Sequence, residues 1–212
     1  QFELKTADSS DQQHKVILIP GSSGKHYAQI INGAPFDIFF SADTERARLL
    51  EQSERTESGT RFTYALGKLI LWSPMDNYVD LKGEVLKSKD FRYLAIANPK
   101  LAPYGKAAEE VLKSLNIWTV LGGRIVRGEN IAQTFQFVSS GNAKLGFVAH
   151  SQIKSSDLSI SGSFWEVPQS IYRPIEQQAV LLRDSSLARE FLSFVKSDES
   201  LSIIYESGYG LP

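Results

Sequence analysis

Short apolar runs alternate with longer amphipathic stretches along the chain, and this alternation restricts the fold more than any other feature of the sequence. Apolar runs bounded by turn residues are typical of buried strands, and apolar residues spaced three or four apart are typical of helices that cover a sheet. The sequence therefore predicts an α/β protein with mixed, mostly parallel sheets flanked by helices. Strands are expected at residues 2–6, 15–19, 38–41, 68–73, 93–97, 125–127, 145–149 and 178–182.

Helices are expected between these strands wherever apolar residues recur at helical spacing. Two of them stop at a glycine, Gly33 and Gly141, which readily takes the left-handed conformation that ends many helices. The expected helices cover residues 25–32, 105–115, 130–140, 186–196 and 199–207.

The composition is that of an ordinary soluble globular protein. Among 212 residues, 23 basic and 24 acidic side chains give a net charge of −1, which argues against nucleic acid as a partner. The apolar runs are much shorter than the roughly 20 residues of a membrane span. Cysteine is absent, which excludes disulfides and thiol catalysis. The first residues show no basic and then apolar leader, so we expect that any signal peptide has been removed.

One connection is too short for the predicted pattern. If strands 2–6 and 15–19 are parallel neighbours, the crossover between them needs roughly 10–12 residues or more. Only residues 7–14 are available, and they show no apolar periodicity. Either the two strands are not parallel neighbours, or residues are missing between Ala7 and Lys15. We favour missing residues.

The segment Gly21-Ser22-Ser23-Gly24 lies between a predicted strand and a predicted helix. Backbone N–H groups and two hydroxyls there meet at the positive end of a helix, an arrangement that binds anions. The alternative is an ordinary N-cap, in which a serine satisfies the first N–H groups of the helix. A phosphate-binding P-loop is excluded, because Ile19 stands where its first glycine should be.

Two later segments have the same arrangement. Residues 98–105 and 128–131 each join the end of a predicted strand to the start of a predicted helix. Prolines fix the first of these loops, so that the N–H groups of Tyr104 and Gly105 lie along the helix axis. Each segment alone is an ordinary connection. Together they place helix starts at the carboxyl ends of strands, where open α/β sheets bind ligands.

The titratable residues do not suggest an enzyme. The three histidines, His14, His26 and His150, lie far apart in the sequence, and none has the spacing of metal ligands. No pairing of a nucleophile with a base can be recognised. We therefore expect a binding protein without catalytic residues.

Several of these motifs, in this order, resemble the periplasmic molybdate-binding proteins, the substrate-binding components of molybdate ABC importers. The resemblance runs nearly from end to end and includes the tail ESGYGLP at residues 206–212. The motifs are GSSGKHYAQIINGAPFDIFFSA at 21–42, RFTYALGKL at 61–69, NPKLAPYG at 98–105, GNAKLGFVA at 141–149 and YRPIEQQAV at 172–180.

The resemblance implies a two-lobed periplasmic binding protein fold of type II. Lobe one would hold residues 1–73 and 178–212, and lobe two residues 74–177, with a ligand cleft between them. The chain would cross between the lobes near residues 72–75 and 174–178.

The resemblance also implies the site. A tetrahedral oxyanion, molybdate or tungstate, would be held by neutral donors from both lobes. The matching positions are Ser9 and Ser23 in lobe one, and Tyr104 and Ile131, through their backbone N–H groups, in lobe two. Many relatives supply a tyrosine hydroxyl at the position of Gln177, so a fifth contact from there remains open. The metal would enter as an oxyanion, with no cofactor and no metal bound directly by side chains.

The implied protein is a periplasmic monomer that delivers its ligand to a membrane permease and binds no nucleic acid. Neutral donors should reject phosphate, because a P–OH hydrogen would meet no acceptor. The alternatives are a sulfate-type or other small-anion binding protein, the ligand-sensing domain of a regulator, and an enzyme of the same fold.

Overall fold

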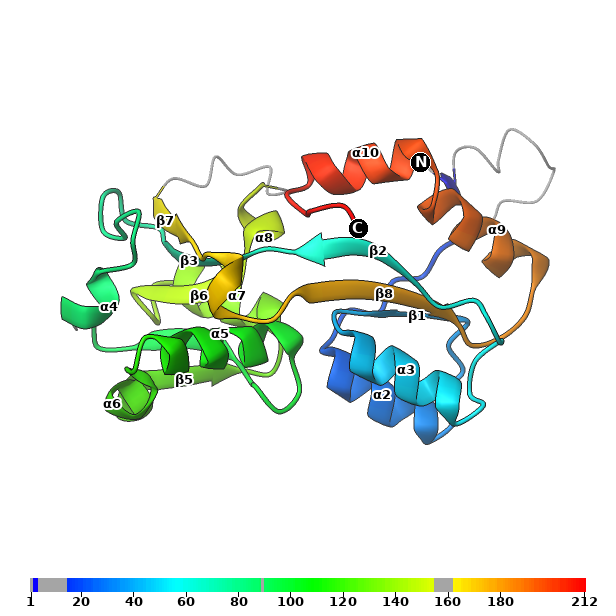
Figure 1. Cartoon of the computed structure of the whole chain (residues 1–212), viewed down its shortest axis with the longest axis horizontal. Coiled ribbons are helices and arrows are strands. Elements are labelled where there is room, and N and C mark those ends of the chain that lie inside the picture. The colour runs from blue at the N-terminus through cyan, green and yellow to red at the C-terminus, as the bar shows by residue number, and fades with distance from the viewer. Residues whose placement is uncertain (1, 4–14, 89, 155–161) are drawn as a thin grey trace.

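Two β-sheets form the centres of two lobes, which lie side by side along the longest axis of the molecule (Figure 1). The computed structural model describes residues 2–3, 15–88, 90–154 and 162–212. The sheet of lobe one has the order β1 (Ile38–Ser41), β8 (Ile175–Leu181) and β2 (Phe62–Gly67). The sheet of lobe two has the order β5 (Ile125–Gly128), β4 (Leu94–Ala97), β6 (Leu145–Ala149), β3 (Leu69–Ser73) and β7 (Ser163–Glu166).

The expected α/β fold with helix-flanked sheets is confirmed, but parallel pairing is less common than expected. Strand β4 pairs in parallel with β5 and β6. All other pairs among the described strands are antiparallel, including both pairs of lobe one. The reason is the path of the chain, since β8 returns from lobe two between β1 and β2 and runs opposite to both.

In lobe one, successive residues of β8 face different helices, as the alternation of a strand requires. Val180 packs with Ile30 of α2 (Ser23–Ile31) and Leu50 of α3 (Thr44–Gln52). Its neighbours Ala179 and Leu181 pack on the other face, against α9 (Ser186–Val195). Helix α10 (Asp198–Glu206) follows α9 and completes that side (Figure 1).

Lobe two is built in the same way, with helices on both faces of its sheet. Helix α5 (Pro103–Ser114) covers the face that carries Leu69 and Leu71, and α7 (Ile131–Ser139) covers the face of Ile70 and Trp72. The remaining helices are short: α4 (Val85–Ser88), α6 (Trp118–Leu121), α8 (His150–Lys154) and 3-10 turns at Gly122–Arg124 and Gln169–Ile171.

The chain passes from the first sheet to the second at Lys68, between β2 and β3. The expected passage at 72–75 instead falls at the end of β3, which pairs with β6 and β7 inside lobe two. The return passage precedes β8, which begins at Ile175. The sheets thus place residues 69–73 in lobe two, because their hydrogen-bond partners lie there.

The expected strand at 15–19 does not form. Residues 15–20 make no strand, and Ile17 and Leu18 are 74% and 80% exposed. An apolar run becomes a strand only where a neighbour pairs with it, and no described strand lies against this one. Most of the expected strand 2–6 lies outside the described residues, and Phe2 and Glu3 are helical. In the described part of the chain, no helix combines the length and the apolar character needed to cross a membrane.

Candidate functional site

The segment at 21–24 and the strand-to-helix loops at 98–105 and 128–131 meet where the two lobes face each other. The N–H of Gly24 in lobe one donates to the carbonyl of Leu101 in lobe two at 2.9 Å. Within lobe two, the N–H of Asn98 donates to the carbonyl of Gly128 at 2.8 Å. The ammonium of Lys25 lies 3.8 Å from Glu129, across the same gap. The fold therefore brings together segments that are far apart in the sequence.

Ser22 and Ser23 are placed differently at the start of α2: the N-cap interpretation is confirmed for Ser22, and anion binding by Ser23 stays a prediction. Ser22 is the N-cap, and its Oγ accepts a hydrogen bond from the N–H of Lys25 at 3.4 Å. Ser23 is buried, and its Oγ accepts from the N–H of Ala42 at 2.9 Å. Among the described residues no acceptor receives the hydroxyl proton of Ser23. This hydroxyl is therefore fixed in place and has a proton to donate.

No pattern in the sequence indicates that Ala42 orients the hydroxyl of Ser23. Ala42 follows β1 and precedes Asp43, the N-cap of α3, whose side chain accepts from the N–H of Arg46 at 2.8 Å. The orienting group on Ala42 is a backbone N–H, which every residue except proline carries. Only the proximity of the β1–α3 turn to α2 could reveal it.

Tyr104 lies in the first turn of α5, after Pro103. N–H groups in a first turn have no acceptor within the helix, so the N–H of Tyr104 is available to a ligand. The loop before it is braced, because the N–H groups of Leu101 and Ala102 both donate to the carbonyl of Asn98. The helix begins directly on the end of β4. A Cβ on Gly105 would lie 2.2 Å from the carbonyl oxygen of Ala97, so only glycine fits there.

The side chain of Tyr104 lies away from this N–H, in the passage between the lobes. Its hydroxyl accepts a hydrogen bond from the amide of Gln177 at 3.4 Å, and both side chains are buried. Burial, helped by the nearby Tyr209, Tyr64 and Tyr172, raises the pKa of Tyr104 well above its ordinary value, so this hydroxyl stays neutral. Gln177 is thus engaged at the passage, and a fifth ligand contact from it stays a prediction.

Ile131 begins α7, the third helix whose start reaches this place. Asn130 caps the helix by accepting from the N–H of Gln133 at 2.9 Å. The N–H of Ile131 is in the first turn and has no intrahelical acceptor. The remaining predicted contact, Ser9, lies outside the described residues. The structure thus brings the loops of Ser23, Tyr104 and Ile131 together and leaves Ser9 as a prediction.

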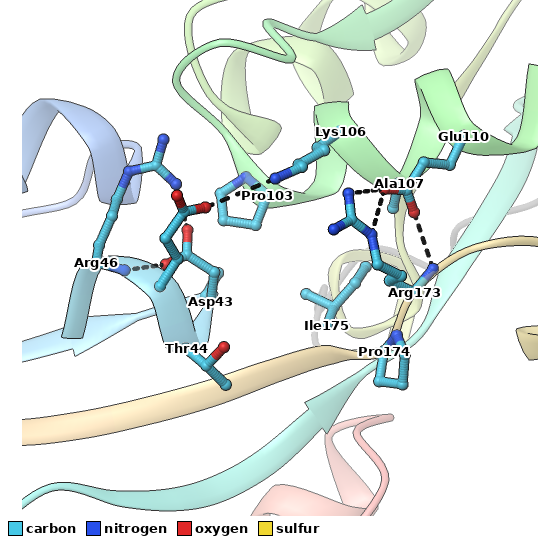
Figure 2. Close-up of a pocket in the computed structure, with 12 residues that line it drawn as sticks. Asp43, Thr44, Arg46, Pro103, Lys106, Ala107, Glu110, Arg173, Pro174 and Ile175 are labelled. Atoms are coloured by element: carbon cyan, nitrogen blue, oxygen red, sulfur yellow. Dashed lines mark hydrogen bonds and ion pairs between the residues drawn. The ribbon is translucent and has the colours of Figure 1, made fainter. Parts of the chain in front are cut away.

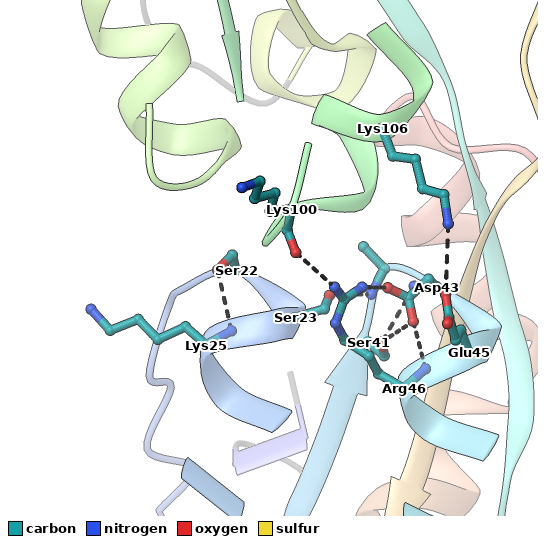
Figure 3. A network of polar contacts seen from close by, with 10 residues as sticks. Ser22, Ser23, Lys25, Ser41, Asp43, Glu45, Arg46, Lys100 and Lys106 are labelled. Carbon is teal, nitrogen blue, oxygen red and sulfur yellow. Dashed lines mark hydrogen bonds and ion pairs between the residues drawn. The ribbon is translucent and has the colours of Figure 1, made fainter. Parts of the chain in front are cut away.

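The proposed donors of this site are neutral, and two nearby cationic side chains are engaged by acidic groups; Figure 3 shows the pair of Arg46 with Asp43. Lys25 pairs with Glu129, and the guanidinium of Arg46 pairs with Asp43. His26 bonds to Gln29 through Nδ1, with its ring edge against Phe36. In the described ranges, no group of three His, Cys, Asp or Glu side chains could hold a metal ion. Such a site suits an anion held by dipoles.

A separate cavity of about 170 Å³ lies nearby, between the start of α3, α5 and the passage before β8 (Figure 2). Its charged groups are paired: Arg173 binds Glu110, and Lys106 lies 3.6 Å from Glu45. Burial acts to raise the pKa of Glu110, but hydrogen bonds from Arg173 outweigh it and lower that pKa. None of Ser23, Tyr104 and Ile131 lines this cavity, so it is distinct from the predicted site.

Comparison with known proteins agrees with the fold and with the motifs. The family model for the bacterial extracellular solute-binding proteins matches residues 2–210. The chain is 46% identical to the molybdate-binding protein ModA of Azotobacter vinelandii over 99% of this chain and 84% of that protein. It is 45% identical to ModA of Rhodobacter capsulatus over 92% of this chain and 77% of that protein.

A solved structure is similar throughout. The periplasmic molybdate-binding protein of Azotobacter vinelandii aligns with a TM-score of 0.92 and 41% identity, covering 99% of this chain and 92% of that one. The two-lobed fold that the motifs implied is therefore confirmed. The chain belongs to the bacterial extracellular solute-binding proteins and, within them, to the molybdate-binding protein family.

Proposed function

We propose that this chain is the substrate-binding component of a molybdate or tungstate ABC importer. It binds one tetrahedral oxyanion between its lobes through neutral O–H and N–H donors. The contacts are the hydroxyl of Ser23 and the backbone N–H groups of Tyr104 and Ile131, with Ser9 as a further donor. It needs no cofactor, and the metal is carried as the oxyanion.

One observation supports this proposal. The hydroxyl of Ser23 accepts a hydrogen bond from the N–H of Ala42, and no described residue accepts the proton of this hydroxyl. The loops that lead to the starts of α5 and α7 meet the loop of Ser23. Each hydrogen bond from such a donor to a buried anion contributes roughly 1.5–3 kcal/mol. Three or four of them, together with the positive ends of α2, α5 and α7, can hold a dianion without a cationic side chain. The names of the relatives make molybdate the first ligand to test.

Neutral donors also account for selectivity against protonated anions. Phosphate carries a P–OH hydrogen near neutral pH, and that hydrogen would find no acceptor among these donors, at a cost of roughly 1–3 kcal/mol. Sulfate has no such hydrogen. Discrimination of sulfate from molybdate must therefore come from the distances between the donors, since a larger anion spans a wider cavity.

The proposal extends to location and partner. The chain acts in the periplasm as a monomer and passes its ligand to the membrane permease of the importer, in keeping with the family to which it belongs. A binding protein requires no catalytic group, and neither catalysis nor nucleic-acid binding is part of the proposed role.

The test is calorimetry of the full chain with molybdate, tungstate, sulfate and phosphate. We expect one site with tight binding of molybdate and tungstate, weak binding of sulfate and none of phosphate. A thermal-unfolding series should agree, because a ligand that binds only the native state adds RT ln(1 + [L]/Kd) to its stability. Tight sulfate binding without molybdate binding would favour the sulfate-type alternative. Stabilisation by none of the four anions would contradict the proposal.

A further inference from the structure

The loop of lobe two that leads to Tyr104 is held on lobe one by two consecutive carbonyl groups. The carbonyl of Leu101 accepts from the N–H of Gly24 at 2.9 Å. The carbonyl of Lys100 accepts from the guanidinium of Arg46, with Nη2 at 3.2 Å (Figure 3). Ser23 is only 5% exposed, and both contacts bridge the lobes next to it, so we expect an anion to enter or leave when the lobes separate. Both of these contacts must then break.

The side chain of Arg46 is held in place for its contact with Lys100 by other hydrogen bonds. Its backbone N–H and its guanidinium both bind the carboxylate of Asp43, which fixes the side chain on the first turn of α3. In that pair the Arg46 and Asp43 side chains are 20% and 19% exposed, the least of any described ion pair. The charged pairs that do span the lobes, Lys106 with Glu45 and Lys25 with Glu129, are longer and more exposed than this pair within lobe one. Exposed pairs contribute little because solvent screens them.

The contact of Arg46 with Lys100 also links the donors of the two lobes. On its lobe-one side, Asp43 follows Ala42, whose N–H orients the hydroxyl of Ser23. On its lobe-two side, the carbonyl of Lys100 belongs to the braced loop that ends at Tyr104. The guanidinium, together with the Gly24 contact, thus links a side-chain donor of lobe one to a main-chain donor of lobe two.

We propose that Arg46 is a positioning residue that fastens the lobe-two loop at Lys100 to lobe one and thereby slows release of the bound oxyanion. This inference rests on the proposed function. Arg46 does not neutralise the anion, since its guanidinium is engaged by Asp43 and Lys100. Its contact with Lys100 exists only when the lobes are together, so its loss should speed dissociation and leave association nearly unchanged.

Stopped-flow kinetics with tungstate tests this on the full chain. For Arg46→Ala we expect the dissociation rate to rise about tenfold, the effect of one lost charge-assisted hydrogen bond, while the association rate changes less than about twofold. Arg46→Lys should behave in the same way, because one ammonium cannot bind Asp43 and Lys100 in the geometry of a guanidinium fork. The matched control is Arg48→Ala on the same helix. Among the described residues the guanidinium of Arg48 binds only Gln52, within α3, so its loss should change neither rate.

A second variant tests the neighbouring contact of the same loop, between Gly24 and Leu101, without changing a charge. A Cβ at Gly24 would lie 2.8 Å from the carbonyl oxygen of Leu101, so Gly24→Ala should push the loop away and also speed dissociation. Alanine is favoured over glycine within a helix, so α2 itself should not be weakened. An unchanged dissociation rate in Arg46→Ala, or an affinity loss due entirely to slower association, would overturn the proposal.

Amide hydrogen exchange at Gly24 in the ligand-free protein separates this proposal from the proposed function. If Arg46 holds the lobes together, the Gly24 amide exchanges faster in Arg46→Ala than in wild type or Arg48→Ala. That result would support the role of Arg46 in holding the lobes together even if the wild type bound neither molybdate nor tungstate. In that case the proposed function alone would fail. Equal exchange rates of the Gly24 amide in all three proteins would overturn the proposed role of Arg46.

Discussion

The side-chain amide of Gln177 donates a hydrogen bond to the hydroxyl of Tyr104 at 3.4 Å and so joins β8 of lobe one to α5 of lobe two. Gly67 lies against the same pair, where a Cβ would be 2.4 Å from the Tyr104 hydroxyl. The side chain of Tyr104 is therefore a structural element of the passage between the lobes. Its backbone N–H, in the first turn of α5, is the part available to a ligand.

Tyr104→Phe should separate these two roles. Loss of the hydroxyl leaves the buried Gln177 amide without its acceptor, which should lower the free energy of unfolding by about 1–3 kcal/mol. Oxyanion affinity should change less than about threefold, since the N–H remains in place. Urea unfolding and calorimetry on the same preparation measure both. A large affinity loss with unchanged stability would place the hydroxyl itself in the ligand site.

Ser23→Ala should weaken oxyanion binding by about 1.5–3 kcal/mol, roughly 10- to 100-fold, because it removes a hydroxyl donor to a buried charge. The neighbouring Ser22→Ala is the matched control. It removes the N-cap of α2 and should cost about 0.5–2 kcal/mol of stability with a much smaller effect on affinity. Calorimetry and thermal unfolding of the two variants check this, and equal affinity losses would show that the roles of the serines are misassigned.

Oxyanion affinity should be nearly constant between about pH 6.5 and 9, because the proposed donors do not titrate in that range. The neutral form of Tyr104 is maintained by its raised pKa. The decisive variant is His26→Ala, which should alter affinity by less than about 0.5 kcal/mol, the usual range for surface substitutions. If the affinity fell tenfold across this range in wild type but not in His26→Ala, the side chain of His26 would instead be a cationic contact of the bound anion.

Stability should fall in alkaline solution. Burial raises the pKa of Tyr64, with a smaller contribution from Tyr209, and burial also raises the pKa of Tyr104. A tyrosine whose folded pKa is raised contributes stability that is present below its unfolded pKa of about 10 and is lost as the pH rises above it. Urea unfolding between about pH 8 and 11 should show this decline, and Tyr64→Phe should reduce it. A stability that stays constant up to pH 11 would contradict the burial of these hydroxyls.

Much of the fold could be predicted because local patterns identify local structure. Strands 38–41 and 145–149 form with the expected bounds, and the expected helices correspond to α2, α5, α7, α9 and α10 with ends shifted by one or two residues. Helix α3 was missed because it is largely polar, with only Ala47 and Leu50 buried. The sequence does contain the N-cap of this helix, Asp43. Aspartate is too common a residue to predict a helix by itself.

The candidate site was predictable only as a set of loops. The strand-to-helix segments of Ser23, Tyr104 and Ile131 are recognisable because glycine, proline and N-cap residues mark where helices begin. Which serine caps α2 and which one keeps a free proton depended on the N–H of Ala42, a group with no sequence signature. The same holds for Arg46 and the carbonyl of Lys100, which are 54 residues apart in the chain.

The sequence by itself determined helices α2, α5, α7, α9 and α10, most of the strands, the glycines at the close contacts and the family, since each of these depends on residues near one another in the chain. Only the tertiary structure decided that β3 belongs to lobe two, that residues 15–19 stay unpaired among the described strands, and that the lobes meet at Gly24 and Leu101. The physical reason is that a backbone donor or acceptor is the same in every residue. Its partner is chosen by the packing of the whole chain and by no local pattern.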